Sequence, residues 1–174
     1  MLSILACQFN LGGPEPPGEP IPVQENAAEV LTEMWQSAVL DAVETGQVTV
    51  LLNEIQLTSL LSQRMEAEEN PVLHDPQVYL RNKMIQIYGT TINGPFKANV
   101  LIGITPINSP EGELTFDITK AEYGPIPAPT ALKDTVSAIL TEAFTGTIGS
   151  LASGIRVNTI VIYNGEMAIV GEVR

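Results

Sequence analysis

The sequence predicts an α+β fold in which a strongly curved antiparallel sheet of about six to seven strands packs against two to three helices. Segments with apolar residues at every third or fourth position, as in helices, are interspersed with segments in which apolar and polar residues alternate, as in strands. Most of the alternating segments follow one another through short turns, which is typical of antiparallel hairpins. The chain of 174 residues is 44% apolar, enough to build a core without disulfides or metal ions. We therefore expect a single folded domain over residues 25–174.

The first part of this domain is predicted to form a helix, a strand and a second helix. Apolar residues spaced by three and four predict a buried stripe on a helix that ends at Gly46. The stripe consists of Ala27, Val30, Leu31, Met34, Trp35, Ala38, Val39, Ala42 and Val43. Residues 47–52 follow as a strand. Asn53 is then placed to cap a helix that has Gln56 at its third position and continues to about Glu66.

The next part is predicted to consist of strands. Residues 77–81 and 84–91 form a hairpin around Asn82-Lys83, and residues 98–105 and 114–119 alternate on either side of a turn at 108–112. Three prolines between residues 125 and 129 end this run, because proline lacks the N–H that a central strand donates.

A third helix and a final hairpin complete the predicted order. The helix carries an apolar stripe and ends at Gly146 and Gly149; the stripe consists of Leu132, Val136, Ile139, Leu140, Ala143 and Phe144. Residues 157–163 and 166–173 then flank Asn164-Gly165, a pair that favours the type I′ turn of a hairpin. We expect these terminal strands to close the sheet.

The charge of the chain excludes some classes of partner. Eight basic side chains are set against 20 acidic ones, which gives a formal net charge of -12. This excess of negative charge opposes binding to phosphate backbones and anionic membrane surfaces, so we expect no nucleic-acid partner. No run of about 18 consecutive apolar residues occurs, so we expect no helix of this sequence to span a bilayer.

The first 24 residues differ in composition from the rest of the chain. Ile4-Leu5-Ala6-Cys7 resembles a bacterial lipobox, whose cysteine is lipidated, although the six residues before Cys7 are fewer than a secretion signal needs. Prolines at positions 14, 16, 17, 20 and 22 predict an extended, solvated tether. Residues 1–24 are thus expected to form a lipidated start and a tether, which would make the protein an extracytoplasmic, membrane-anchored lipoprotein. The alternative is a disordered terminus with an incidental thiol.

The order of the predicted elements resembles a family of small bacterial lipoproteins. The resemblance lies in VTVLLNEIQLTSLL, DPQVYLRNKMIQIYG, PEGELTFDITKAEYGPIPAP and IVIYNGEMAIVG, with a helix before the last segment, and it covers residues 48–171. The family comprises lipoproteins of the YpmS type and related LmeA-like proteins. The resemblance implies a half-open, curved sheet wrapped around a helix, similar to tubular lipid-binding domains. It implies no catalytic or ligand-binding residue.

Few residues offer catalytic or metal chemistry. His74, the single histidine, lies beside Asp75, a pairing that general acid–base catalysis can use, but a surface histidine in a proline-flanked loop is the simpler interpretation. One histidine and one cysteine cannot form a zinc site, and the acidic residues near position 68 lack the spacing of a calcium loop. The sequence contains no nucleophile elbow, P-loop or dinucleotide fingerprint. We expect neither a cofactor nor enzymatic activity.

Two classes of function remain. In the first, the apolar concave face of the curved sheet forms a groove that binds a lipid or another apolar small molecule beneath the third helix. The predicted lipid-binding residues are Ile85, Ile87, Val100, Ile102, Ile104, Phe116 and Ile118 on the strands and Leu132, Val136, Ile139 and Leu140 on the helix. In the second, the same residues form a closed core, and the domain is a structural or assembly protein of the cell envelope that docks on a protein partner.

Overall fold

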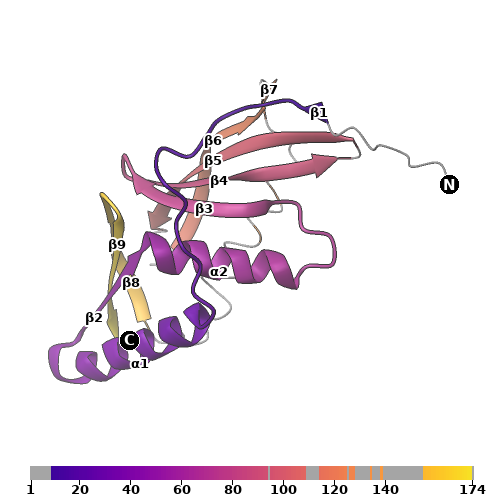
Figure 1. Ribbon diagram of the computed structural model, residues 1–174. Coiled ribbons are helices and arrows are strands. Elements are labelled where there is room, and N and C mark those ends of the chain that lie inside the picture. Colours follow the sequence, from indigo (N-terminus) through magenta and orange to yellow (C-terminus); the bar gives the residue numbers. More distant parts are fainter. Residues whose placement is uncertain are drawn as a thin grey trace.

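The computed structural model describes residues 9–93, 95–108, 114–124, 126–127, 134, 138 and 155–173. Over these residues the chain has the predicted α+β fold, with two helices and two sheets around a large apolar core (Figure 1). The helices are α1 (Ala27–Thr45) and α2 (Glu54–Ala67).

The larger sheet, which we call sheet A, has six strands. Five of them are antiparallel neighbours in chain order: β3 (His74–Arg81), β4 (Met84–Asn93), β5 (Phe96–Asn108), β6 (Leu114–Tyr123) and β7 (Ile126–Pro127). The sixth, β1 (Phe9–Asn10), pairs with β5 in the parallel direction. Sheet A is strongly curled, as the sequence predicted (Figure 1). The β3–β4 turn is also confirmed, since Asn82 and Lys83 both have positive φ, at 55° and 61°, as a type I′ turn requires.

The smaller sheet, sheet B, consists of β2 (Gln47–Asn53), β9 (Glu166–Val173) and β8 (Ile155–Tyr163), with β9 in the middle. The prediction that the terminal strands close the main sheet is therefore wrong, although their hairpin is confirmed. Its turn is not of the predicted type I′, because only Gly165 has a positive φ, at 88°, and Asn164 does not. β9 instead pairs with β2 over the full length of that strand, from Gln47 opposite Glu172 to Asn53 opposite Glu166. β2 lies between two helices in the chain and has no hairpin neighbour, so β9 supplies the partner that its backbone needs.

Local signals fix the two helices. Gly46 ends α1 with a φ of 74°, and its N–H donates to the carbonyl of Ala42. Asn53 caps α2 as predicted: its side chain accepts from Gln56 N, and Asn53 N donates to the Gln56 side chain, both at 2.9 Å. Val43, which was expected in the buried stripe of α1, is 80% exposed, so the buried side of α1 is narrower than predicted.

Most of the predicted third helix lies outside the described residues. Asp134 and Ala138, the two described positions within it, are helical and exposed. In the described part of the chain, no helix has the length and apolar character needed to cross a membrane.

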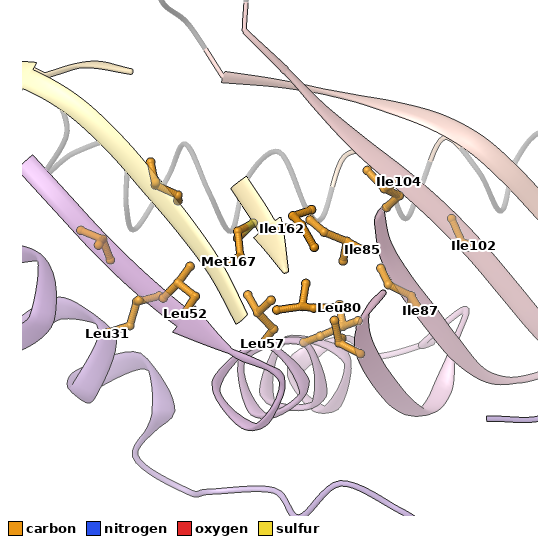
Figure 2. Close-up of a cluster of buried hydrophobic side chains, with 14 of the residues drawn as sticks. Leu31, Leu52, Leu57, Leu80, Ile85, Ile87, Ile102, Ile104, Ile162 and Met167 are labelled. Carbon is orange, nitrogen blue, oxygen red and sulfur yellow. The ribbon is translucent and has the colours of Figure 1, made fainter. Parts of the chain in front are cut away.

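The core lies between α1, α2, the concave face of sheet A and one face of sheet B. Figure 2 shows side chains of β4 and β5, such as Ile85 and Ile102, pointing towards Leu57 of α2 and Met167 of β9. The most deeply buried large side chains are Trp35, Leu52, Leu73, Leu80, Ile85, Ile87, Ile102, Ile104 and Met167. Both sheets thus contribute to one continuous cluster.

Side chains of α2 cover the outer edge of β3. Val78 N donates to Thr58 Oγ1 at 2.9 Å, and Leu80 N donates to Glu54 Oε1 at 2.7 Å. Thr58 is completely buried. Because an unpaired strand edge exposes backbone donors, these two side chains satisfy groups that would otherwise need another strand.

Residues 9–24, which we call the strap, run along the outside of sheet A to the start of α1 (Figure 1). The strap is extended and largely exposed, but hydrogen bonds attach it to sheet A over most of its length and to α2 at its far end. Leu11 N donates to Lys97 O at 2.8 Å, and at the other end Gln24 N donates to Ser59 Oγ at 2.8 Å. These contacts were not anticipated from the sequence. Cys7 lies outside the described residues.

Candidate functional site

The predicted lipid-binding strand residues lie together on the concave face of sheet A. Their exposed fractions show that this part of the face is closed to solvent: Ile85 is 1% exposed, and Ile87, Val100, Ile102 and Ile104 are 0% exposed. Figure 2 shows Ile85 close to Ile162 and Met167 of sheet B, and all these residues belong to the main core cluster. Their side chains are therefore packed among other apolar side chains.

The other predicted lipid-binding residues divide into two groups. Phe116 and Ile118 of β6 are half-buried and pack against the same core cluster. Leu132, Val136, Ile139 and Leu140 lie outside the described residues.

An open cavity of about 370 Å³ lies beside the start of β3, at the edge of sheet A. Its residues from β4 and β5, Thr90, Ile92 and Lys97, lie on the same face of the sheet as Tyr88 and Leu101, opposite to Ile85 and Ile102. Its walls come from the end of α2, the segment 71–77 that leads into β3, neighbouring residues of β4 and β5, and Val23 of the strap. The inner wall includes Met65 and Leu73, which are 3% and 1% exposed and belong to the main core cluster. The cavity, which we call the β3 pocket, is thus continuous with the apolar cluster beneath sheet A. Its volume falls in the range of small-molecule sites.

The wall of the β3 pocket contains an unusual stretch of backbone. The pairing of β3 with β4 shifts register between His74 and Gln77, and Asp75 has a φ of 49° directly before Pro76. A residue before proline normally adopts extended backbone, so this left-handed conformation is uncommon there. Such outliers concentrate at functional sites.

Gly89 on β4 makes room for this bulge. A Cβ at this position would lie 2.7 Å from Leu73 Cδ1 and 2.9 Å from the His74 carbonyl oxygen. Because real Cβ atoms do not approach other atoms so closely, a side chain at position 89 would force the bulge to move. The bulge in β3 therefore depends on the absence of a side chain at Gly89 of the neighbouring strand β4.

Several polar groups of the β3 pocket have no partner among the described residues. The hydroxyl oxygen of Thr90 is buried and makes no hydrogen bond to any of them. Within the described part of the chain, Lys97 forms no ion pair, and the His74 side chain makes no hydrogen bond. Because buried polar groups normally have partners, Thr90 is available to bond a ligand or a water molecule.

The polar residues around the pocket do not form a metal site. No group of three potential ligands from histidine, cysteine, aspartate and glutamate occurs among the described residues. The pocket instead combines apolar side chains with a hydroxyl, an imidazole, an ammonium group and the carboxylates of Glu66 and Asp75. This combination suits a molecule that has an apolar part and a polar end.

The sequence interpretation missed this pocket and misplaced His74. The structure makes His74 the half-buried first residue of β3, opposite Thr90, and not part of an exposed loop. A signal was present, since Gly89 falls within a predicted strand and Pro76 lies directly before the neighbouring one, and proline and glycine in or beside strands often mark a bulge.

No protein-family model matches this chain, and a search of curated proteins finds no match to its sequence. The resemblance to small bacterial lipoproteins therefore stays a hypothesis that rests on the segments quoted above. Function has to be argued from the site.

Proposed function

We propose that this protein is a non-catalytic binding protein for a lipid or another apolar small molecule, which enters the β3 pocket and lies against Met65 and Leu73, at the edge of the apolar core that the concave side of sheet A covers. The observation that supports the proposal best is the inner wall of the pocket. Met65 and Leu73 belong both to this wall and to the cluster that contains Ile85, Ile87 and Ile102. An apolar chain in the pocket would therefore contact the main apolar cluster directly.

The polar groups of the pocket suit one end of such a molecule. The Thr90 hydroxyl has no partner in the part of the chain that the structure describes, and a ligand oxygen near it would satisfy this buried group. Lys97 adds a positive charge, whereas Glu66 and Asp75 add negative charge. These opposing charges favour a polar or zwitterionic end over a strongly charged one.

Membrane attachment belongs to the same proposal. A lipidated Cys7 would place the domain at the membrane on the extracytoplasmic side, where lipids are close to the β3 pocket. The anionic character of the chain does not itself attract it to a membrane, so attachment would depend on the lipid at Cys7.

Native mass spectrometry of protein purified without detergent tests the binding proposal. We expect the wild-type protein to carry an apolar molecule. Ile92, which is 43% exposed and lines the pocket, is a suitable site for filling the cavity: Ile92→Trp should fold normally and lose the bound mass. Leu51→Trp is the matched control, because Leu51 is 54% exposed on sheet B and does not line this pocket. Bare wild-type protein that also fails to bind added fatty acid would contradict the proposal.

A structural or assembly role is the second candidate. It is favoured by the near-zero exposure of the predicted groove residues, which is typical of a closed core. In this case the protein would dock through a surface such as the outer face of sheet B. On that face, exposed Leu51 and Val161 flank Ala168 in register. Ile92→Trp would then change nothing, whereas Leu51→Asp would abolish recovery of a partner from envelope extracts.

A further inference from the structure

The convex face of sheet A carries a second apolar cluster. Gln77, Tyr88 and Leu101 stand opposite one another in a row across β3, β4 and β5. Tyr79 lies two residues further along β3, and its ring meets that of Tyr88 edge-on at 5.6 Å between centroids. Tyr79, Tyr88 and Leu101 are all at least nine-tenths buried, and they pack against Ile21 of the strap.

The strap binds this face mainly through its backbone. Ile21 N donates to Gln77 Oε1 at 2.5 Å, and Gln77 Nε2 donates to the Ile21 carbonyl at 3.4 Å, so one side-chain amide pairs with both backbone groups of one residue. Tyr79 Oη donates to the Glu19 carbonyl at 3.1 Å. Tyrosine rings with a hydroxyl donor to a carbonyl, set against an extended proline-rich chain, are the chemistry by which aromatic grooves recognise polyproline II segments.

The strap itself has the composition of such a ligand. Prolines at 14, 16, 17, 20 and 22 restrict its backbone, which reduces the entropy lost on docking. Between residues 14 and 22, Pro14 and Ile21 are half-buried and the other residues are exposed. The segment is thus held by one aliphatic side chain and a few hydrogen bonds.

We propose that the convex face around Gln77, Tyr79, Tyr88 and Leu101 is a recognition surface for extended, proline-rich polypeptide segments, and that residues 14–22 occupy it as a built-in ligand. The partner is a proline-rich segment of another protein, with an aliphatic side chain at the position of Ile21. This surface lies on the opposite face of sheet A from the main core, and the inference does not depend on lipid binding.

The built-in ligand sets the conditions under which a partner binds. A covalently attached segment competes at an effective concentration of the order of millimolar. A separate peptide of equal intrinsic affinity therefore binds the wild-type chain weakly, and it binds strongly only after the strap has left the surface. The strap is in this sense autoinhibitory.

A peptide-binding experiment on the full-length chain tests the proposal. Ile21→Asp places a carboxylate against Leu101 and the tyrosines and should release the strap, which limited proteolysis between Gly12 and Val23 would detect. A labelled synthetic peptide with the wild-type sequence of residues 9–24 should then bind the Ile21→Asp chain at least about tenfold more tightly than the wild-type chain. Chemical shift changes should centre on Tyr79, Tyr88 and Leu101.

Two controls make the result decisive. A peptide that carries aspartate in place of Ile21 should not bind, and Leu101→Asp in the Ile21→Asp chain should abolish binding of the wild-type peptide. A folded Ile21→Asp chain with a released strap and no affinity for the peptide would overturn the proposal. If Ile21→Asp does not fold, the milder Ile21→Ala variant replaces it, because it removes most of the strap's apolar contact and leaves the recognition surface unchanged. Unfolding of both would show that the strap is an integral part of the core, which also overturns the proposal.

Discussion

The carboxylate of Glu54 binds both the guanidinium group of Arg81 and the backbone N–H of Leu80. Glu54 is the first residue of α2, whereas Leu80 and Arg81 end β3. The Leu80 carbonyl in turn accepts from Gly165 N at 3.0 Å, in the turn between β8 and β9. One carboxylate thus helps to join α2, sheet A and sheet B at a single point.

We expect Glu54→Ala to destabilise the fold by about 1–3 kcal/mol, because it leaves the Leu80 N–H without its partner and removes the ion pair. Urea denaturation followed by circular dichroism measures the change. Glu122→Ala is the control: its ion pair with Lys120 is 46% exposed on both sides, and its loss should cost less than about 1 kcal/mol. Equal effects of the two variants would show that the Leu80 contact is unimportant.

Ile102→Asp distinguishes a groove from a closed core. Ile102 is 0% exposed, so an unpaired carboxylate there costs on the order of several kcal/mol if the site is dry. In a closed core the variant should unfold. In a groove that admits water it should stay folded and lose bound lipid, as thermal denaturation and native mass spectrometry would reveal. The conservative Ile102→Val variant should keep both fold and ligand, with a cost of about 0.5–1.5 kcal/mol.

His74→Ala tests whether the β3 pocket performs chemistry. For a binding pocket, we expect stability to change by less than about 1 kcal/mol and ligand affinity by less than about tenfold, since His74 is half-buried and makes no side-chain hydrogen bond within the described part of the chain. Binding and denaturation measurements check both numbers. Complete loss of a biological activity from a stable, ligand-binding variant would identify His74 as a catalytic residue.

High pH should loosen the strap. Burial raises the pKa of the Tyr79 phenol above its usual value of 10.0, and the nearby Glu54 carboxylate raises it further, against a smaller lowering by Arg81. A pKa raised by folding means that the folded state binds the proton more tightly. The contribution of Tyr79 to stability is therefore complete below about pH 10 and is lost as the pH rises through the folded-state pKa.

Hydrogen exchange of the Ile21 amide, compared at pH values below and above 10, would detect this loosening after correction for the intrinsic rate. Tyr79→Phe should remove the specific pH dependence. Tyr163→Phe, at a tyrosine that is 76% exposed, should leave it intact. Identical pH profiles for the wild type and Tyr79→Phe would contradict the assignment.

Cys7→Ser tests the membrane anchor. If Cys7 is lipidated, the wild-type protein expressed from its own locus should require detergent for release from membranes, and the variant should be soluble. Fractionation and intact mass measure both outcomes. A wild-type protein in the cytosolic fraction, with the unmodified mass, would exclude the anchor.

The features that the sequence predicted correctly depend on neighbouring residues. Asn53 and Gln56 cap α2 across one turn, and Asn82-Lys83 and Asn164-Gly165 fix their hairpins through two residues each. The residues of a cap or a two-residue turn favour one local backbone conformation by themselves, so these features can be predicted without knowing the rest of the fold.

The missed features depend on contacts between distant parts of the chain. The alternation of apolar and polar residues identified β2 as a strand but not β9 as its partner. Such alternation shows which face of a strand is buried, and it does not show which other strand pairs with it. The hydrogen bond from Tyr79 to Glu19 spans 60 positions, and nothing in the proline-rich composition indicates that the strap rests on a tyrosine pair. The β3 pocket likewise arises where α2, β4 and the strap meet around the bulge.

The pairing in sheet B also determines when the chain can finish folding. The ribosome completes β2 long before residues 166–172, the partners of residues 47–53, have been made. At synthesis rates of about 5–20 residues per second, the delay is roughly 5 to 25 s. During this time Val48, Val50 and Leu52 have no β9 beside them, so the nascent chain presents an apolar strand that a chaperone can hold. Sheet A, whose main strands pair with their chain neighbours, is free to form first.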